Sequence, residues 1–383
     1  MPSNLLIQSD NLEGLNYLLE NGFKGKIDLV YIDPPYATGG NFTITNGRAT
    51  TISNSKNGDI AYTDTLKGND FIEFLRERLI LIRELLSEKG SIYLHIDYKI
   101  GHYVKVMMDE VFGAENFRND ITRIKCNPKN FDRIGYGNIK DLILLYTKTQ
   151  NPIWNEPRKK YSEKDLENLF PKKDKQGRRY TTVPIHAPGE TENGKSNQPF
   201  KGISPPTGRH WRTDVETLEQ WDSAGLIEWS SKGNPRKIIY ADEREGMRVQ
   251  DIWEFKDPQY PDYPTEKNAE MLDLIVKTSS NENSIVLDCF CGSGTTLKSA
   301  QTHNRNWIGI DQSDLAIKVT KQKINDIGID LFAQKTEYDF FDLERTVNNF
   351  QENKCLLTEF ENIDNEVPTA YGERFGKIAA LAR

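Results

Sequence analysis

The sequence lacks any apolar run approaching the roughly 20 residues that a membrane-spanning helix needs. Its first residues also lack the basic and then apolar pattern of a secretory signal peptide. Cysteine is scarce, with four residues at positions 126, 289, 291 and 355 in a chain of 383. A disulfide framework is therefore not expected, and the composition predicts a reduced, cytoplasmic protein without membrane association.

Disorder is not expected, because Leu, Ile, Val and Phe recur in short blocks and a chain of this length can bury a large core. The mean hydropathy of -0.66 is polar for a globular protein, which indicates a normal core that carries a long polar insertion. The net charge of -7 gives no sign of a nucleic-acid partner. Positive charge is nevertheless concentrated between Arg118 and Arg179, where 16 Lys or Arg stand against 8 Asp or Glu.

Strand and helix signals alternate on both sides of this basic stretch. Short apolar segments typical of strands occupy 4–10, 27–36, 91–97, 284–290 and 306–311. Helical spacing of apolar residues predicts helices over 11–22 and 71–90, the second ending at Gly90. The alternation predicts an α/β fold with a mainly parallel sheet. Ligands bind such sheets at the carboxyl ends of the strands, where we expect Asp10, Asp33, Asp97, Asp288 and Asp311.

The first chemical motif is Asp33-Pro34-Pro35-Tyr36, which follows a strand of the buried type. The two prolines fix the backbone and leave its carbonyls without partners in a following helical turn. A carboxylate and a carbonyl together suit an amino group with two N–H donors, and the ring of Tyr36 can stack on a flat heterocycle. The tetrapeptide alone would favour the plainer alternative of a strand end closed by an aromatic side chain.

The second motif runs from Val286 to Thr296 and joins a strand to a helix through Phe290-Cys291-Gly292-Ser293-Gly294. Its glycines allow a ligand to approach the backbone and the helix N-terminus closely. It has neither the lysine of a phosphate loop nor the third glycine of the dinucleotide fingerprint. Asp311 ends the next strand, where it can accept from ribose hydroxyls. The motif therefore indicates a nucleoside-type cofactor without a pyrophosphate, an ordinary turn being the alternative.

Together these motifs resemble those of DNA amino-methyltransferases that use S-adenosylmethionine, in the circularly permuted group in which D-P-P-Y precedes F-x-G-x-G. The likeness covers residues 4–148 and 262–325. It includes Asp10-Asn11, Tyr263-Pro264-Thr265-Glu266-Lys267 and Gly309-Ile310-Asp311. It implies a Rossmann-like methyltransferase sheet, circularly permuted, with an inserted target-recognition region. Cys289, where proline is common, and Lys267-Asn268, in place of Lys-Pro, depart from the pattern.

The resemblance also implies roles for individual residues. Asp33 and the Pro34 carbonyl hold the exocyclic amine of a flipped base, Tyr36 stacks on that base, and Pro35 completes the catalytic motif. The methyl group passes directly from sulfur to nitrogen, with no covalent enzyme intermediate and no metal. The implied cofactor pocket consists of Asp10, Asp33, Lys267, Asp288, Phe290, Gly292, Gly294 and Asp311. Within it Asp311 faces the ribose, Asp10 the adenine amine, and Asp288 and Lys267 the methionine end.

The same resemblance divides the chain into functional parts. Residues 1–148 form the catalytic part of the methyltransferase domain, 149–261 the target-recognition insertion, 262–330 the cofactor-binding part and 331–383 a C-terminal extension. The insertion, with the basic stretch that begins near 118, mixes positive and aromatic residues as phosphate contacts and base stacking require. These candidates include Arg118, Arg123, Lys125, Tyr136, Arg178, Arg179, Arg209-His210-Trp211-Arg212 and Asn234-Pro235-Arg236-Lys237. Double-stranded DNA is the expected partner, with a second copy of the chain and a restriction subunit as further candidates.

The cysteines do not suggest a different chemistry. Cys289 and Cys291 form a C-x-C pair, but no second pair of ligands has metal-binding spacing, so no metal site is expected. Cys126 lies in the basic stretch, and amino-methylation needs no cysteine nucleophile.

The sequence thus predicts a site-specific DNA methyltransferase that makes N6-methyladenine. Asp33 favours adenine, because the cytosine-N4 enzymes of this group more often begin the motif with Ser or Thr. Cytosine-N4 methylation remains an alternative. Methylation of RNA or of a protein glutamine is another, although the related motif there usually starts with Asn. A catalytically silent DNA-specificity subunit is the last alternative, and the presence of both motifs counts against it.

Overall fold

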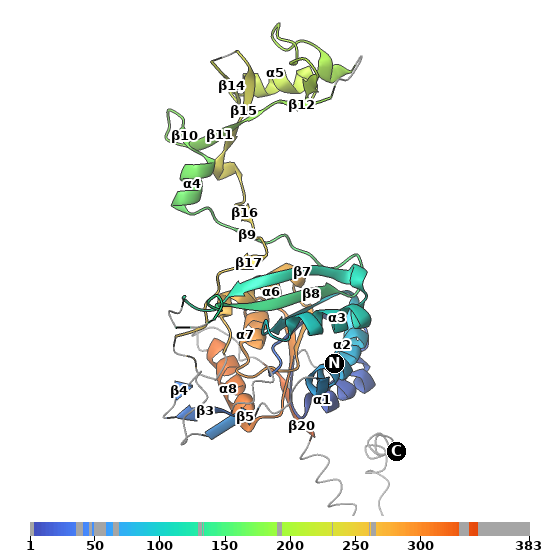
Figure 1. Cartoon of the computed structure of the whole chain (residues 1–383). Coiled ribbons are helices and arrows are strands. Elements are labelled where there is room, and N and C mark those ends of the chain that lie inside the picture. The colour runs from blue at the N-terminus through green and yellow to red at the C-terminus, as the bar shows by residue number, and fades with distance from the viewer. Residues whose placement is uncertain are drawn as a thin grey trace, which may run out of the picture. The chain divides into compact units, whose positions relative to one another are not determined.

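The computed structural model describes residues 4–35, 41–45, 48–49, 59–63, 69–128, 132, 134–189, 194–231, 233–259, 261, 266–328 and 337–343. The chain divides into two compact units, one of residues 1–155 with 251–383 and one of residues 156–250. The larger unit contains a nine-stranded sheet with helices on both faces (Figure 1), which confirms the predicted α/β class.

The large sheet has the strand order β17-β7-β8-β6-β2-β18-β19-β1-β20. Strands β6, β2, β18, β19, β1 and β20 run parallel, whereas β8 is antiparallel to both of its neighbours, β6 and β7. The sheet is therefore mixed at one side and parallel over its centre. The bounds are β1 (Leu5–Gln8), β2 (Ile27–Ile32), β6 (Leu86–Ile96), β7 (Phe117–Ile124), β8 (Lys140–Thr147), β17 (Ile252–Trp253), β18 (Ile285–Asp288), β19 (Asn306–Asp311) and β20 (Asp339–Asp342).

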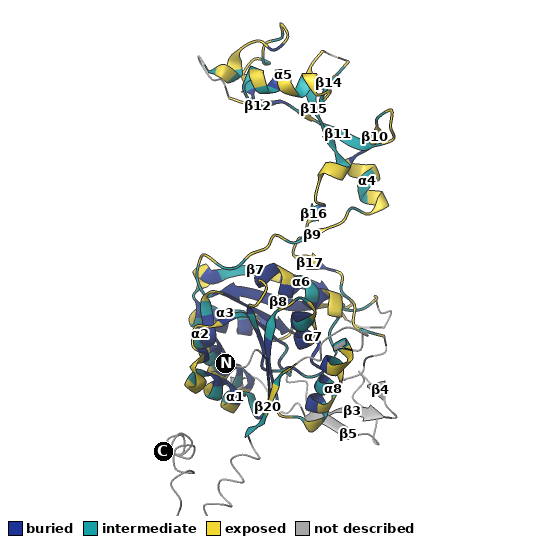
Figure 2. Ribbon diagram, turned by 180° about the vertical axis from the view of Figure 1, so that it is seen from behind, coloured by how far each residue is buried: buried dark blue, intermediate teal, exposed yellow. Residues whose placement is uncertain are grey.

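Two groups of helices cover this sheet (Figures 1 and 2). Helices α1 (Asn11–Leu18), α2 (Asn69–Leu85) and α3 (Gly101–Phe112) pack together on one face, and α6 (Ala269–Ser279), α7 (Thr295–Thr302) and α8 (Asp314–Asn325) on the other. Shorter helical turns are η1 (Leu19–Phe23), η2 (Ala114–Asn116) and η5 (Asp326–Gly328). A small antiparallel sheet is formed by β3 (Asn41–Thr45), β4 (Arg48–Ala49) and β5 (Asp59–Thr63).

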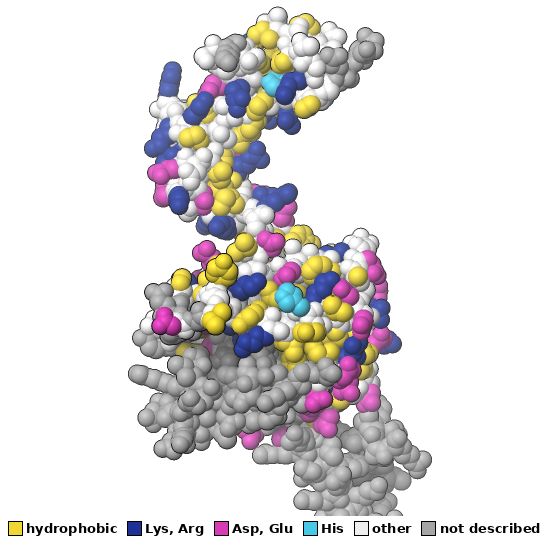
Figure 3. Space-filling model, in the orientation of Figure 1, with side chains coloured by type: hydrophobic (Ala, Val, Ile, Leu, Met, Phe, Trp, Pro, Cys, Tyr) yellow, Lys and Arg dark blue, Asp and Glu magenta, His cyan; other side chains and the backbone are white. Residues whose placement is uncertain are grey.

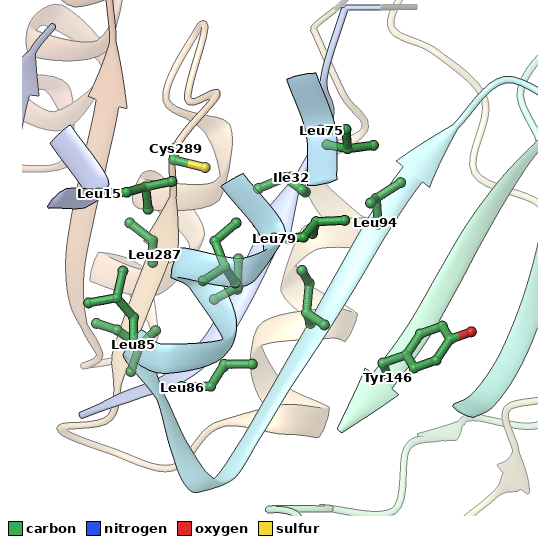
Figure 4. Close-up of a cluster of buried hydrophobic side chains, with 14 of the residues drawn as sticks. Leu15, Ile32, Leu75, Leu79, Leu85, Leu86, Leu94, Tyr146, Leu287 and Cys289 are labelled. Carbon is green, nitrogen blue, oxygen red and sulfur yellow. The ribbon is translucent and has the colours of Figure 1, made fainter. Parts of the chain in front are cut away.

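The packing of α2 shows why its sequence is helical. Phe71, Leu75, Leu79 and Ile82 follow one another at three- or four-residue intervals and are fully buried. Figure 4 shows Leu75 and Leu79 among side chains from the sheet, with Ile32 of β2, Leu94 of β6 and Leu287 of β18 in the same cluster. This core joins the strand that precedes Asp33 to the strand that precedes the glycine turn.

The predicted end of this helix at Gly90 is wrong. The helix ends at Leu85, and Gly90 lies inside β6. Leu86 pairs with Ile27 of β2, and the backbone N–H of Lys148 donates to the Gly90 carbonyl at 2.8 Å. A Cβ atom at Gly90 would lie 2.8 Å from the carbonyl oxygen of Ile27. Glycine at position 90 is therefore explained by close pairing with β2, which is distant in sequence. It does not act as a helix cap.

The smaller unit has its own core. Ile185, Phe200, Trp211 and Leu218 are buried together. A four-stranded antiparallel sheet has the order β10-β11-β15-β14, and β12-β13 and β16-β9 form separate pairs. Its elements are β9 (Arg158–Lys159), α4 (Glu163–Leu169), β10 (Lys172–Lys173), β11 (Arg179–Pro184), β12 (His186–Pro188), η3 (Lys195–Asn197), β13 (Arg209–Trp211), α5 (Val215–Ser223), β14 (Ile227–Trp229), β15 (Pro235–Tyr240), η4 (Ala241–Glu243) and β16 (Met247–Arg248). The unit lies within the predicted insertion of residues 149–261, whose functional role stays a prediction.

Among the described residues, no helix is both long enough and apolar enough to cross a membrane.

Candidate functional site

The two sequence motifs lie on adjacent strands. Asp33 follows β2, Asp288 ends β18 and Asp311 ends β19. Because β2 pairs with β18 and β18 with β19, all in parallel, these carboxylates stand at the same edge of the sheet. The sequence motifs are more than 250 residues apart along the chain, and the strand order places them at one edge.

The glycine turn is shaped by tight backbone contacts. The N–H of Cys291 donates to the Ile310 carbonyl at 3.1 Å, and that of Gly294 donates to the Cys291 carbonyl at 2.7 Å. Gly294 has φ of 73° and is the N-cap of α7. A Cβ atom there would lie 2.7 Å from the Thr320 hydroxyl oxygen, closer than side chains allow. Glycine is required at this position both by its backbone conformation and by the space available.

Asp311 is fixed by the turn and by the helix that follows it. Its carboxylate accepts the N–H of Gly292 and the N–H of Ser313, each at 2.9 Å. Burial raises its pKa, and the backbone donors act in the opposite direction. A carboxylate held in this way retains lone pairs that can accept hydroxyl donors from a ligand.

Of the two acids Asp288 and Asp311, Asp288 has the more strongly shifted pKa. It is buried below the turn and accepts the Phe290 N–H at 3.0 Å. Burial raises its pKa to about 7, hydrogen bonds from Thr296 and Phe290 oppose the rise, and the charges of Asp33 and Asp311 add to it. A positively charged ligand group nearby would favour its ionised form.

Asp33 lies between two side chains that the first motif does not contain. Its side chain is 15% exposed and forms an ion pair with Lys267, which precedes α6. The other carboxylate oxygen lies 3.7 Å from Nδ1 of His95, at the end of β6. Lys267 therefore contacts the first motif, and its expected place at the methionine end of the cofactor stays a prediction. Pro34 is buried and Pro35 half-buried, and Tyr36 is outside the described residues.

A buried polar network extends behind Asp33. Nε2 of His95 lies 3.3 Å from Asp141 Oδ2, and the Tyr31 hydroxyl lies 3.0 Å from His95 Nδ1. Asp141 also binds Lys125 at 2.6 Å. Sequence analysis did not identify His95 or Asp141 as site residues. The available signal was an ionisable side chain in or beside the apolar run of each strand, although this signal does not reveal which residues meet.

The structure corrects the expected role of Arg123. This residue was predicted to contact phosphate, yet it is fully buried on β7, where it donates to Asp257 at 2.6 Å and to the Phe255 carbonyl at 2.8 Å. Lys125 is likewise paired internally with Asp141. Part of the positive charge of the basic stretch is thus used inside the fold.

Asp10 and Phe290 are linked through Arg78 and Phe74. Asp10 caps α1 by accepting the Leu12 N–H at 2.8 Å, and both of its oxygens lie 3.3 Å from the Arg78 guanidinium. That guanidinium also lies 3.5 Å from the centre of the Phe74 ring, which is 6.3 Å from the ring of Phe290. The structure thus connects two predicted cofactor residues through Arg78 and Phe74, which the motifs do not contain.

Glu266 anchors the segment before α6. It forms an ion pair with Lys323 of α8, which also donates to the Thr295 hydroxyl at 3.1 Å. Glu266 and Lys267 are the described residues of the predicted segment from Tyr263 to Lys267, and the other three lie outside the described part of the chain. Lys267 is therefore held close to the helix N-terminus that carries the glycine turn.

No group of three or more His, Cys, Asp or Glu side chains in the described part of the chain is arranged to hold a metal ion. The site instead offers carboxylates, backbone N–H groups and one ion-paired lysine. Such a set can accept hydrogen bonds from hydroxyl and amino groups of a ligand. It can also favour positive charge that develops on a substrate nitrogen near Asp33.

Comparison with known proteins gives a consistent result. A model of the N6/N4 DNA methylase family matches residues 27–322. The type II methyltransferase M.EcaI of Enterobacter cloacae is 42% identical over 326 residues, a match that covers 84% of this chain and 69% of that protein. The StyLTI Mod subunit of a type III restriction-modification enzyme from Salmonella typhimurium is 25% identical, and the match covers 79% of this chain but only 50% of that protein. The crystal structure of an M1.HpyAVI–SAM complex is 16% identical with a TM-score of 0.45, covering 84% of this chain and 99% of that one.

Proposed function

The chain belongs to the N6/N4 family of DNA methylases, and from this premise we propose that it methylates the N6 amine of an adenine flipped out of double-stranded DNA. The predicted family is confirmed, and with it S-adenosylmethionine as the methyl donor of these enzymes. The observation that supports the proposed site best is the pairing of β2 with β18, which brings Asp33 and the glycine turn to one sheet edge.

The residues at this edge fit the methyl donor. We propose that Gly292 and Gly294 leave room for it against the turn, that Asp311 accepts its ribose hydroxyls and that the buried Asp288 faces its ammonium group. Phe290 and Asp10 complete the proposed pocket on the side of Arg78. When bound, S-adenosylmethionine supplies an electrophilic methyl group whose bonding electron pair remains on sulfur after transfer.

Asp33 then acts on the base. Its carboxylate and the Pro34 carbonyl accept the two N–H donors of the exocyclic amine and so orient the nitrogen lone pair towards the methyl group. Negative charge at Asp33 stabilises the positive charge that nitrogen gains during transfer. Lys267, paired with Asp33, holds that carboxylate in place. Tyr36, which lies outside the described residues, is proposed to stack on the base.

The first residue of the D-P-P-Y motif favours adenine over cytosine as the target base. Asp33 occupies the position where cytosine-N4 enzymes of this group more often have Ser or Thr. Cytosine-N4 methylation is the second candidate, because the family includes both activities.

We also propose that the sheet is a circular permutation of the methyltransferase fold. The cofactor strand β18 follows the catalytic strand β2 in the chain but lies directly beside it in the sheet. By the same proposal the parts of the chain are 1–148, 149–261, 262–330 and 331–383, with target recognition assigned to the second. A second copy of the chain and a restriction subunit are proposed partners, the latter because relatives include Mod subunits of restriction-modification enzymes.

The product test uses purified protein, labelled S-adenosylmethionine and unmethylated genomic DNA. After digestion to nucleosides, we expect label in N6-methyladenine, because the motif begins with Asp33, where the cytosine-N4 enzymes of this group more often have Ser or Thr. Label in N4-methylcytosine would instead support the second candidate. DNA that carries no label after incubation with folded protein would contradict methylation altogether.

DNA contact by the smaller unit is proposed from a cluster of arginines. Lys and Arg side chains are spread over this unit on the face shown in Figure 3. Arg209 lies 3.1 Å from Nδ1 of His186, whose pKa is lowered by burial and by the charges of Arg209, Arg212 and Arg236. A site at which positive charge accumulates in this way suits DNA phosphate.

We expect Arg212→Ala to weaken DNA binding and to make the slope of log affinity against log salt shallower by about 1, as loss of one phosphate contact requires. Arg178→Ala provides the matched control. The sequence also offered Arg178 as a phosphate contact, but its side chain already pairs with Asp242 at 2.8 Å and Glu243 at 3.0 Å, so we expect the wild-type slope for this variant. Fluorescence anisotropy at several salt concentrations measures both. Equal slopes for wild type and Arg212→Ala would remove Arg212 from the proposed DNA contact.

A further inference from the structure

The buried ring of His95 lies between two carboxylates. Nε2 is 3.3 Å from Asp141 Oδ2, and Nδ1 is 3.7 Å from Asp33 Oδ1. His95 is completely buried and Asp141 nearly so, whereas the Asp33 side chain is 15% exposed. A titratable group is therefore placed directly behind the residue that holds the target amine in the proposed function.

The charged groups around His95 balance one another. From β2, Asp33 and the Tyr31 hydroxyl face the ring. From β8, Asp141 faces it, and Lys125 and Arg123 lie behind Asp141, at 2.6 and 3.7 Å from that carboxylate. Lys267 forms an ion pair with Asp33, and Asp257 forms one with Arg123. With a neutral ring, these three carboxylates and three cations carry no net charge.

The groups around the His95 ring can accommodate both its neutral and its protonated form. Burial lowers the pKa of His95, because a charged ring would lose its water, while Asp141 and Asp33 favour the charged form. Burial alone would raise the pKa of Asp141, but His95 and Lys125 lower it, so this carboxylate is ionised. The Tyr31 hydroxyl can donate to the neutral ring and accept from the protonated one.

Methylation of an amine releases a proton, on the proposed function. The nitrogen gains a bond to carbon and a positive charge, and it returns to neutrality when one of its N–H protons leaves. Asp33 is within hydrogen-bond reach of that amine in the proposed arrangement. A ring that lies between Asp33 and the ionised Asp141 has a carboxylate on each side to stabilise the proton that it receives.

We propose that His95 is a positioning residue that acts through Asp33 and receives the proton released by the amine. The proton moves from nitrogen to an Asp33 oxygen. A side-chain shift that brings Asp33 Oδ1 from 3.7 Å to hydrogen-bond distance of His95 Nδ1 then lets the proton pass to the ring, so that Asp33 becomes a carboxylate again. Asp141 stabilises the imidazolium through Nε2. The proton later returns through Asp33 to water when the product leaves, and the neutral ring is restored.

The test compares His95→Gln with wild type in single-turnover methylation of DNA, with enzyme in excess. The glutamine retains polar contacts but cannot take a proton. We expect a rate about 100-fold lower at neutral pH, the lower end of the contribution of general acid–base groups, with affinities for DNA and S-adenosylmethionine unchanged. The wild-type rate should fall as pH falls through the lowered pKa of His95, because a ring that is already protonated cannot accept another proton. This acid limb should be absent in His95→Gln, whereas any effect of Asp288 remains in both profiles.

Two further variants distinguish this role from simple packing. His102→Gln makes the same change at an exposed position on α3 and should leave both rate and pH profile at wild-type values. Asp141→Asn removes the charge that stabilises the imidazolium, so the acid limb should move to lower pH. Thermal unfolding confirms that each variant is folded, and Asp141→Asn serves as the test if His95→Gln is not.

The proposal is overturned if His95→Gln keeps the wild-type rate, or if its rate falls while the acid limb is unchanged. An unshifted acid limb in Asp141→Asn would also overturn it. The proposed function is judged separately, by the base that wild-type protein methylates. An active wild type with an unaffected His95→Gln variant would therefore reject only the role of His95.

Discussion

Replacing Asp33 with Ala is expected to lower the rate of methyl transfer at least about 1,000-fold, because orientation of the amine and stabilisation of its positive charge are lost together. The affinity for S-adenosylmethionine should change little, since the glycine turn, Asp288 and Asp311 remain in place. Single-turnover methylation and equilibrium binding of the cofactor measure the two quantities. Loss of cofactor binding in a folded variant would mean that Asp33 is chiefly a cofactor residue.

Two related variants control for the loss of charge at Asp33. Asp33→Asn keeps the shape of the side chain and an oxygen for Lys267, so we expect a smaller loss of rate than in Asp33→Ala. Asp97→Ala removes another acid that follows a parallel strand, β6, and whose side chain accepts the Lys99 N–H at 2.9 Å. Asp97 has no role in the proposed site, so the rate of methyl transfer by Asp97→Ala should stay near that of the wild type. A large loss in Asp97→Ala would show that the acidic edge acts through its overall charge.

Replacing Gly294 with Val is expected to weaken S-adenosylmethionine binding by more than about tenfold, since the substitution strains the backbone at positive φ by about 1–2 kcal/mol and forces the turn open. The physical reason is the 2.7 Å approach of a Cβ atom to the Thr320 hydroxyl oxygen. That hydroxyl also donates to the Gly292 carbonyl at 3.0 Å, so a shift of Thr320 changes both glycines of the turn. Calorimetric titration with the cofactor measures the effect.

Gly25→Val provides the matched control for backbone strain. Gly25 has φ of 68°, close to the 73° of Gly294, but no atom lies within 4 Å of an added Cβ. Both variants should therefore lose some stability to thermal unfolding, whereas only Gly294→Val should lose cofactor affinity. Equal losses of affinity in the two variants would contradict the assignment of the turn to cofactor binding.

Much of the fold follows from local sequence patterns. The strand at 306–311 and the turn into α7 were predictable because an apolar run ends in an acid and two glycines precede a helix. The five strand-end acids were predictable for the same reason. Gly90 shows the limit of local signals, since a glycine that ends a helical pattern is indistinguishable from one that permits close strand pairing.

The parts of the site that sequence analysis missed depend on contacts between distant segments. Lys267 and Asp33 are far apart in sequence, and their ion pair follows from the neighbouring positions of β2 and of the segment before α6. His95 and Asp141 meet because β6 and β8 are adjacent and antiparallel. Arg123 was misassigned to phosphate contact because its charge is evident in the sequence, whereas its buried partner Asp257 is not.

We propose that this site methylates the N6 amine of adenine at a defined DNA sequence. Sequencing that detects modified bases individually, on DNA treated with the wild-type protein and with Asp33→Ala, tests it most directly. We expect modified adenines that share one short sequence context in the wild-type sample and none in the Asp33→Ala sample. Modified cytosines, or modified adenines that persist without Asp33, would contradict it.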